Sequence, residues 1–381
     1  MMNLKINREL PRDHKPFTDK YFLRTNQILK NEGLNPNISM KVFTRGEGVV
    51  AGLEDAVEVI KKYSNLEEVG GEVWVTKDKT YETKQPLMII KGPVQSFVEL
   101  ETMYLGVLSH AMSEANGFSM SNSSEIEQKF KRLKDIYGDK PITYFGARHY
   151  HWSLDKDIAG AALKGGAVQT STDRGSSNIG KEGAGTTPHI LTLALANKYG
   201  KENATLKTAE LFDKNMPESI PRVTLVDTFN KELTDSILVA QYFGDRMNLF
   251  RIDTCGENIG EWGSLYKGEK AKDPTYQTGT GVTVELVKNL RKNLINKGYG
   301  GNTGIFLSSG FGNEEKAKVF VEEDKKFKKE TGYNLFEGVG IGEVSKAIFC
   351  TADIFEIDDM PFSKTGREVA GVDYKNMVRR L

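Results

Sequence analysis

Between residues 142 and 340 the chain repeats one pattern, in which a short apolar run ends in a cluster of small or polar residues and a helical segment follows. The apolar runs are Ile142–Phe145, Ala167–Val168, Val223–Val226, Leu249–Ile252, Ile305–Leu307 and Phe336, the last leading into Gly338-Val339-Gly340. Apolar strands that alternate with helices are typical of a parallel sheet buried on both faces. The pattern predicts an α/β barrel and favours it over an open doubly wound sheet, which would also gather polar groups at its strand ends.

The chain before and after this pattern has a different character. Its first part alternates helical faces, such as Phe17–Lys30, Leu53–Tyr63 and Val94–His110, with strand-like runs, as in an α+β unit. After Gly342, the segment Lys346–Phe355 is extended and apolar, and such strands alone could not bury both faces. We therefore expect an N-terminal unit at residues 1–118, a strand-and-helix unit at 119–344, and a tail at 345–381 that packs on the first unit.

The composition narrows the classes of partner. At 381 residues, two domains are the default expectation. The 52 basic and 52 acidic side chains balance, which gives no general attraction to nucleic acid or to an anionic membrane. Two cysteines are too few for a disulfide framework or a cysteine-built zinc site. With no secretory signal and no apolar run of about 18 residues, we expect a soluble cytoplasmic protein.

The polar clusters at the strand ends contain the groups that a phosphorylated sugar requires. They supply hydroxyls, glycines, arginines, carboxylates and a histidine, namely Thr186, Thr187, Ser308, Ser309, Gly310, Gly338, Gly340, Gly342, Arg148, Arg251, Asp227, Asp253 and His189. Hydroxyls and glycine N–H groups bind phosphate, and arginines add charge-assisted bonds to phosphate or carboxylate. Aspartates bind sugar hydroxyls or Mg²⁺. This set favours a phosphosugar over an acyl or peptide substrate.

The segment Gly185–His189 is where these features meet. The apolar run that follows predicts a helix with Thr187 as its N-cap, Pro188 at its first position and Gly200 beyond its end. His189 then lies in the first turn, where free backbone N–H groups and the helix dipole favour phosphate. Taken alone, such a histidine is more often an ordinary polar residue, and only the other strand ends favour a phosphate-handling role.

Other patterns are better explained without chemistry. Gly338–Gly342 has GxGxG spacing and lacks the βαβ context of a dinucleotide site. Cys255 has no evident histidine partner, which favours a bystander thiol over a nucleophile. No serine lies in a GxSxG elbow, so a hydrolase triad is unsupported. Arg148 and Arg251 could each, on their own, be surface ion-pair partners.

Taken together, the motifs resemble those of the nicotinate phosphoribosyltransferase family, within the type II group that also includes nicotinamide and quinolinate phosphoribosyltransferases. Each motif alone is weak, but their order matches over nearly the whole chain. The similar segments are Thr18–Tyr21 (TDxY), Glu99–Gly106 (ELETxxLG), Phe145–Arg148, Ser177–Asn178, Gly185–His189 (GTxxH), Leu225–Thr228 (LVDT) and Arg251–Thr254 (RxDS/T).

The resemblance implies a fold and a reaction. The fold would be an N-terminal α/β sandwich joined by the C-terminal tail, and a central TIM-like α/β barrel, in a homodimer whose active sites share residues. The reaction would join nicotinate to 5-phosphoribosyl 1-diphosphate, giving nicotinate mononucleotide and pyrophosphate for NAD biosynthesis. ATP would be a co-substrate that phosphorylates a histidine. Mg²⁺ would bind mainly through the substrate diphosphate, without a metal site made by the protein alone.

The resemblance also implies roles by position. His189 would be the phosphorylated histidine, with Arg251 and Asp253 completing the catalytic set. Tyr21 would stack on the pyridine ring in the partner subunit's site. Arg148 and Arg251 would hold the nicotinate carboxylate or the diphosphate, and Asp253 the ribose hydroxyls or the metal. The other substrate-binding residues would be Thr186, Asp227 and, for the 5-phosphate, Ser309, Gly310, Gly338 and Gly340.

The chain departs from the family pattern in places. His149 stands where many relatives have a second arginine, Cys255-Gly256-Glu257 follows the RxDS/T motif where Gly-Asp is usual, and Cys350 alone cannot form the zinc knuckle of some members. The alternatives are a nicotinamide or quinolinate phosphoribosyltransferase, or a non-catalytic phosphosugar sensor on the same fold. Quinolinate would need more basic residues than the motifs supply. Nicotinamide would need an amide-reading carboxylate, for which the motifs offer no candidate.

Overall fold

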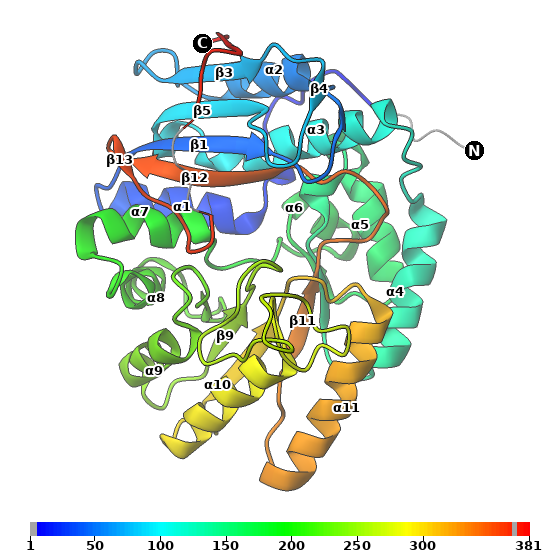
Figure 1. Cartoon of the computed structure of the whole chain (residues 1–381), viewed down its shortest axis with the longest axis vertical. Coiled ribbons are helices and arrows are strands. Elements are labelled where there is room, and N and C mark those ends of the chain that lie inside the picture. The colour runs from blue at the N-terminus through cyan, green and yellow to red at the C-terminus, as the bar shows by residue number, and fades with distance from the viewer. Residues whose placement is uncertain (1–5, 368–371) are drawn as a thin grey trace.

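The computed structural model describes residues 6–367 and 372–381, which build an antiparallel and a parallel sheet, each of six strands. In Figure 1 the antiparallel sheet lies at the top and the parallel sheet below it, with helices around both. The candidate site lies at the boundary between these two sheets.

The antiparallel sheet joins the two ends of the chain. Its strand order is β13-β12-β1-β5-β3-β14. The strands are β1 (Asn37–Phe43), β3 (Glu72–Thr76), β5 (Met88–Pro93), β12 (Thr351–Ile357), β13 (Met360–Pro361) and β14 (Met377–Arg379); β2 (Gly48–Val49) and β4 (Thr80–Tyr81) form a separate ribbon. Strand β12 pairs with β1, with Ile357 opposite Ile38, and lies beside it in Figure 1. The C-terminal segment thereby brings its own residues to the boundary between the sheets.

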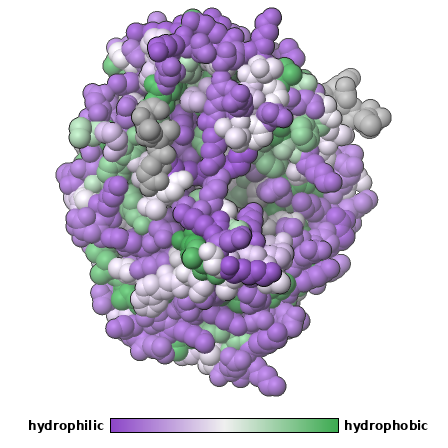
Figure 2. Space-filling model, viewed as in Figure 1, coloured by the Kyte–Doolittle hydropathy of each residue, from purple (hydrophilic) through white to green (hydrophobic). Residues whose placement is uncertain are grey.

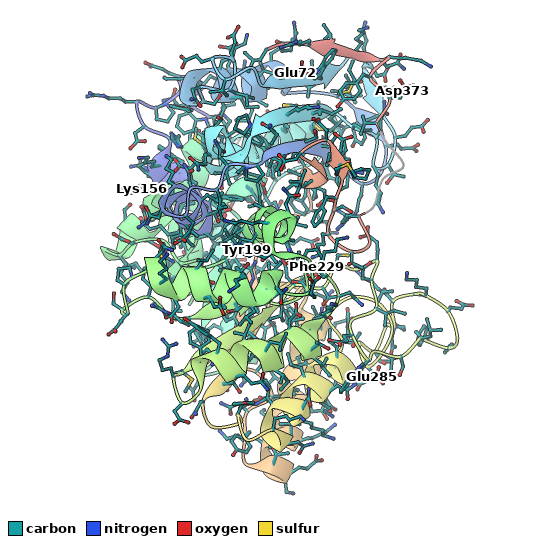
Figure 3. All side chains as sticks on the ribbon, turned by 90° about the vertical axis from the view of Figure 1, so that its left-hand side faces the viewer. Glu72, Lys156, Tyr199, Phe229, Glu285 and Asp373 are labelled. Carbon is teal, nitrogen blue, oxygen red and sulfur yellow. The ribbon has the colours of Figure 1, made fainter. Side chains whose placement is uncertain are left out.

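Helices from both halves of the chain share one core with this sheet. They are α1 (Lys20–Asn31), α2 (Leu53–Tyr63), α3 (Glu101–Ala115), α7 (His189–Tyr199) and α8 (Ala204–Asn215). The predicted apolar face of α2 is confirmed, because Ala56, Val57, Val59 and Ile60 are all buried. In Figure 3, Tyr199 and Phe229 lie at the level where the two sheets' units meet. Helix α7 therefore lies at the boundary between the unit of the antiparallel sheet and that of the parallel sheet.

The predicted parallel sheet of six strands is confirmed. Its strands are β6 (Ile142–Tyr144), β7 (Gln169–Thr170), β8 (Val223–Leu225), β9 (Asn248–Ile252), β10 (Thr303–Leu307) and β11 (Gly338–Ile341), in the order β7-β6-β11-β10-β9-β8. Strands β7 and β11 begin two residues after the apolar residues Ala167 and Phe336 that start the predicted runs. The sheet curls into a half-barrel, and no ladder among the described residues joins its edge strands β7 and β8. These two strands have only two and three residues, which leaves few backbone groups for closure.

Helices cover the outer side of the half-barrel. They are α4 (Ser123–Tyr137), α5 (Asp155–Lys164), α6 (Asp173–Ser176), α9 (Glu232–Phe243), α10 (Val284–Asn296) and α11 (Glu314–Thr331). Short 3-10 turns complete the chain, namely η1 (Lys15–Phe17), η2 (Val94–Ser96), η3 (Val98–Leu100), η4 (Ala147–His149), η5 (Trp152–Leu154) and η6 (Ser177–Ile179). The strands of the sheet are buried beneath these helices, in a core separate from that of the antiparallel sheet.

One predicted helix is wrong in its extent. The segment Val94–His110 does not form one helix, because Phe97 has φ −141°, and η2 and η3 precede α3. The backbone N–H of Val94 donates to Pro36 O at 3.0 Å, which ties this turn to the start of β1. As a result, Glu101 is the first residue of α3 and faces the boundary between the sheets.

The face of the molecule in Figure 2 is mainly hydrophilic, and its apolar side chains are scattered over it. Among the described residues, no helix combines the length and the apolar composition needed to cross a bilayer.

Candidate active site

A cavity of about 550 Å³ lies at the carboxyl ends of the parallel strands, beneath β12 and beside α1 and α3. Eight of the residues predicted to carry the chemistry line it together: Tyr21, Arg148, His189, Arg251, Asp253, Ser309, Gly310 and Gly340. They come from positions 21 to 340 of the chain, so their convergence is a property of the fold. The structure therefore brings most of the predicted set to one place.

Three predicted substrate-binding residues do not line this cavity. The Thr186 hydroxyl donates to the carbonyl of Val223 and is occupied by the backbone of β8. Asp227 is fully buried behind His189. Gly338 starts β11, at the end of the strand away from the cavity, where Gly342 takes part instead. These three residues lie behind or beside the residues that line the cavity.

His189 lies in the first turn of α7, as predicted, and is its first residue; Gly200 follows the helix. The predicted cap is wrong by one residue, because Pro188 is the N-cap and makes no side-chain cap bond. The Thr187 hydroxyl instead accepts from the N–H of Leu225 at 3.1 Å. The two hydroxyls of this motif therefore fasten the start of α7 to β8, and this sets the position of the His189 ring.

Lys364, from the C-terminal segment, is the main functional residue that sequence reasoning missed. Its Nζ lies 2.9 Å from Nε2 of His189 and donates to the buried carboxylate of Asp227. Because an ammonium only donates, Nε2 is the acceptor, and Nδ1 carries the proton toward Thr228 Oγ1 at 3.1 Å. Burial and the charge of Lys364 lower the pKa of His189, which agrees with a neutral ring.

Lys364 itself remains charged. Burial acts against its charge, but Asp227 and Asp253 outweigh burial and raise its pKa. The signal available in the sequence was the basic stretch Lys364–Arg367 in the tail, which has no motif to single it out. Only the pairing of β12 with β1 places this lysine beside His189.

Asp253 and Arg251 lie at the end of β9. Asp253 accepts from the Ser308 hydroxyl at 2.8 Å, and its other oxygen lies 3.8 Å from His189 Nε2. Burial opposes its ionisation, but His189, Arg251 and Lys364 together lower its pKa. The Arg251 guanidinium makes one long contact, 3.5 Å to Thr187 O, and its buried Nε has no partner among the described residues. Its donors are therefore available to an anion.

The Tyr21 ring lies in the cavity of its own chain. It is 6.0 Å from the Arg251 guanidinium, and its hydroxyl donates to Asp19 at 3.3 Å. Tyr21 lines the same cavity of its own chain as both arginines, and its role in a partner subunit's site stays a prediction. Gly185 allows this arrangement, because a Cβ there would lie 3.2 Å from the Tyr21 ring and the backbone has φ +140°.

Helix α3 brings an unpredicted carboxylate to Arg148. Gly106 lets α3 approach the loop after β6, because a Cβ there would lie 2.3 Å from the carbonyl oxygen of Tyr150. This close packing places Glu101 Oε1 3.6 Å from Arg148 Nη1, and both side chains line the cavity. The ELETxxLG motif contains this glutamate, but its spacing gives no sign of which carboxylate faces the ligand.

At the end of the cavity opposite Glu101, the loop after β10 has a backbone geometry suited to binding phosphate. Ser309 and Gly310 have φ +72° and +83°, left-handed conformations that open backbone N–H groups to an anion. The carbonyl of Ser309 accepts from Lys316 Nζ at 3.0 Å. Burial and the charge of Lys272 lower the pKa of Lys316 to about 7. A second cavity of about 900 Å³ continues from this loop past Lys129, Lys272 and Lys316.

The cavity holds more basic side chains than the motifs indicated: Arg45, Lys272, Lys364 and Arg367 also line it. Three of these are engaged in ion pairs: Lys364 pairs with Asp227, while Arg45 and Arg367 share Glu257, and Arg367 also lies 3.5 Å from Asp353. Lys272 makes no ion pair with any residue in the described ranges. The cations open to ligand are therefore Arg251, Lys272 and, beside Glu101, Arg148.

His149 cannot replace an arginine as a charged clamp. Its Nδ1 lies 2.9 Å from the carbonyl of Gly342, and its ring lies against Phe349, with the centroids 4.1 Å apart. Burial and the nearby Arg148 lower its pKa to about 3, so the ring is neutral at neutral pH.

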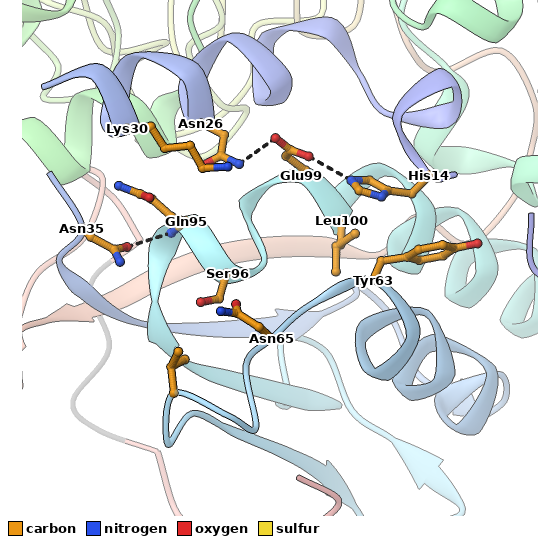
Figure 4. A pocket seen from close by; sticks show the side chains of 11 residues that line it. His14, Asn26, Lys30, Asn35, Tyr63, Asn65, Gln95, Ser96, Glu99 and Leu100 are labelled. Atoms are coloured by element: carbon orange, nitrogen blue, oxygen red, sulfur yellow. Dashed lines mark hydrogen bonds and ion pairs between the residues drawn. The ribbon is translucent and has the colours of Figure 1, made fainter. Parts of the chain in front are cut away.

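A separate polar pocket of about 390 Å³ lies on the other side of α1 (Figure 4). Its inner wall is Glu99, which pairs with His14 at 2.9 Å and accepts from Asn26 at 2.6 Å. None of the predicted site residues lines it. Glu99 and Glu101 of the same motif thus face different cavities.

The described residues include no cluster of three or more histidine, cysteine or acidic side chains placed to hold a metal ion. Asp253 is one of several carboxylates that line the cavity, and it lies beside the Ser308 hydroxyl at the carboxyl end of β9.

Known proteins resemble this chain in sequence and in fold. Residues 19–112 match the family model described as quinolinate phosphoribosyl transferase, N-terminal domain. A nicotinate phosphoribosyltransferase of Bacillus subtilis (strain 168) is 27% identical over 236 residues, which cover 55% of this chain and 44% of that protein. The chain therefore matches less than half the length of this relative.

Solved structures extend the likeness in fold to nearly the whole chain. Nicotinate phosphoribosyltransferases of Vibrio cholerae and Porphyromonas gingivalis have TM-scores of 0.64 and 0.62 at 13% and 14% identity. The matches cover 94% and 93% of this chain, and 90% and 93% of those structures. The chain therefore shares the matched N-terminal domain with the quinolinate phosphoribosyl transferase model, and its fold is that of these nicotinate phosphoribosyltransferase structures over nearly its whole length.

Proposed function

We propose that this protein is a nicotinate phosphoribosyltransferase, which forms nicotinate mononucleotide and pyrophosphate from nicotinate and 5-phosphoribosyl 1-diphosphate. The observation that carries the proposal is the single cavity that unites Tyr21 and Arg148 with Arg251, Asp253 and the Ser309–Gly310 loop. An aromatic ring and an arginine suit a pyridine carboxylate, and the remaining groups suit a phosphoribosyl diphosphate. The homodimer, ATP use, closed barrel and cytoplasmic location implied by the resemblance are part of this proposal.

The proposed substrate follows from the available charges. Two arginines line the cavity near the Tyr21 ring, Arg148 and Arg251, the latter 6.0 Å from the ring. Arg148 would hold the single carboxylate of nicotinate, which leaves Arg251 for the diphosphate. Quinolinate carries two carboxylates, and the further arginines that line the cavity, Arg45 and Arg367, are paired with Glu257. Arg251 and Lys272 remain for the diphosphate, whose charge requires more than one cation.

The chemistry asked of the residues is mainly electrostatic. Breaking the bond between ribose C1 and the diphosphate oxygen leaves positive charge on the sugar and sends the electron pair to the leaving group. Arg251 and Lys272 would stabilise the growing negative charge, and the ionised Asp253 would face the ribose. The pyridine nitrogen is already nucleophilic, so Tyr21 and Arg148 have only to orient it. Mg²⁺ would be held by Asp253 together with the diphosphate and would neutralise phosphate charge.

ATP use would run through His189. Its Nε2 lone pair would attack the γ-phosphorus of ATP, forming the N–P bond while the P–O bond breaks and ADP leaves with the electron pair. Lys364, which now occupies this nitrogen, would then pair with the new phosphoryl group. Water would later attack this phosphorus, which breaks the N–P bond, releases inorganic phosphate and restores the His189 imidazole. Such a charge change at the start of α7 could alter the affinity of the cavity for its substrates.

Tyr21→Ala should raise the KM for nicotinate about tenfold or more, because stacking contributes about 1 to 3 kcal/mol per base. Steady-state pyrophosphate release, with each substrate varied in turn, measures the effect. Tyr21→Phe is the matched control, since it keeps the ring and loses only the bond to Asp19. Equal losses for nicotinate and for phosphoribosyl diphosphate would argue against stacking.

His189→Ala should remove stimulation by ATP and keep some basal synthesis, because the reaction itself does not need the imidazole. The measurement is the ratio of the rates with and without ATP, together with acid-labile phosphate on the protein. Full ATP stimulation in the variant would exclude His189 as the phosphorylated residue.

The test of the proposed activity is pyrophosphate release with nicotinate, nicotinamide and quinolinate in parallel, with and without ATP. We expect nicotinate to be the preferred base. Release with quinolinate alone would reassign the substrate, and no release with any base would favour a non-catalytic sensor.

A further inference from the structure

We propose that Glu101 is a specificity-determining residue: its neutral form admits a pyridine carboxylate at Arg148, and its ionised form repels that carboxylate and accepts from the amide of nicotinamide. This inference rests on the proposed function and deepens it, because it assigns the choice between acid and amide to one side chain.

The position of Glu101 supports the proposal. Its side chain is 9% exposed, lines the cavity and lies 3.6 Å from Arg148 Nη1, too far for a hydrogen bond. No hydrogen bond to its carboxyl group is found among the residues that the structure describes. A ligand carboxylate bound to Arg148 would therefore meet a second carboxyl group that has unused hydrogen-bonding capacity.

Glu99, two residues earlier, shows how different the environment of Glu101 is. Figure 4 shows the Glu99 carboxylate between His14 and Asn26, each joined to it by a dashed line. Burial opposes ionisation of Glu99, but these two partners lower its pKa. Glu101 has no such partners, and burial raises its pKa to about 8 despite Arg148. One turn of backbone thus holds one ionised carboxylate and one that is mainly neutral at pH 7.

The charged groups around Glu101 explain why protonation of its carboxyl group affects ligand binding. Arg148 faces Glu101 from η4, and Asp19 and Tyr21 lie on the α1 side. Asp353 comes from β12 and is itself 3.5 Å from Arg367. With Asp19 and Glu101 both ionised, Arg148 would already be outweighed before a ligand arrives. A nicotinate carboxylate would add a further negative charge. Protonated Glu101 avoids this repulsion and can donate its O–H to the ligand.

The sign of the pH dependence follows. Below a pKa of about 8 Glu101 is mainly neutral, and nicotinate binds without repulsion. As pH rises through this value, nicotinate binding requires uptake of a proton, so its apparent affinity falls by about tenfold for each further pH unit. Nicotinamide is uncharged and should not lose affinity, because the ionised carboxylate accepts its amide N–H.

The test compares kcat/KM for nicotinate and nicotinamide from pH 7 to pH 9, in the full-length protein and in Glu101→Gln. Glu114→Gln, at the far end of α3 and outside the cavity, is the matched control. For the parent protein, we expect the ratio of nicotinate to nicotinamide kcat/KM to fall about tenfold over this range. In Glu101→Gln the ratio should be independent of pH, since an amide cannot titrate.

Calorimetry gives a second readout that does not depend on turnover. Nicotinate binding at pH 9, measured in two buffers with different ionisation enthalpies, should take up close to one proton in the parent protein and none in Glu101→Gln. An active parent enzyme with a constant ratio, or an equal pH dependence in Glu101→Gln, would overturn the role of Glu101 and leave the proposed function intact. No turnover of any base would overturn the proposed function as well.

Discussion

Lys364→Met is expected to destabilise the protein and to abolish its ATP-stimulated activity. The Asp227 side chain is fully buried, its Oδ2 accepts from Lys364, and its Oδ1 has no partner among the described residues. Removal of the lysine leaves this carboxylate unpaired in the interior, which costs about 3 kcal/mol or more. His189 Nε2 loses its donor at the same time. Chemical denaturation measures the free energy of unfolding, and pyrophosphate release measures the activity.

A double variant separates the two effects. Lys364→Met combined with Asp227→Asn removes both charges, so most of the lost stability should return. The ATP-stimulated rate should stay low, because no cation remains beside His189. A single Lys364→Met variant as stable as the parent, or a double variant with normal ATP stimulation, would contradict the role given to this lysine.

Arg251→Met should lower kcat/KM by about 100-fold or more, the scale found when a preorganised donor to a developing negative charge is removed. The guanidinium of Arg251 lines the cavity with most of its donors free, so it is available to the diphosphate. Because its protein contacts are few, the free energy of unfolding should change little.

The matched control for this variant is Arg246→Met, in the turn before β9. Arg246 is exposed and pairs with Asp213 at 2.7 Å, away from the cavity. Arg251→Lys is a second variant that keeps the charge and loses the planar fork, and it should recover only part of the rate. Equal rates in Arg251→Met and Arg246→Met would remove Arg251 from the catalytic set.

The sequence was most informative where local pattern and topology agree. Four of the apolar runs overlap parallel strands, and the other two lie just before one, because buried parallel strands are apolar and their carboxyl ends meet at one edge. This is why Arg251, Asp253, Ser309 and Gly310, each just after or at the end of a strand, converge in one cavity.

Contacts between distant segments placed the site residues that local sequence patterns do not predict. Lys364 reaches His189 because the C-terminal segment returns to the antiparallel sheet, a contact between residues 175 positions apart. Glu101 meets Arg148 because Gly106 permits close helix packing, and its spacing alone did not distinguish it from Glu99. The Thr186 hydroxyl donates to the Val223 carbonyl on β8, a contact between distant segments that no local pattern predicts.

The most direct measurement of the central claim is the product formed from nicotinate and 5-phosphoribosyl 1-diphosphate by the purified protein with Mg²⁺, resolved by chromatography and mass. We predict nicotinate mononucleotide and pyrophosphate in equal amounts, with formation lost in Arg251→Met. Release of pyrophosphate without nicotinate mononucleotide would indicate hydrolysis of the sugar diphosphate and would contradict the proposed transferase.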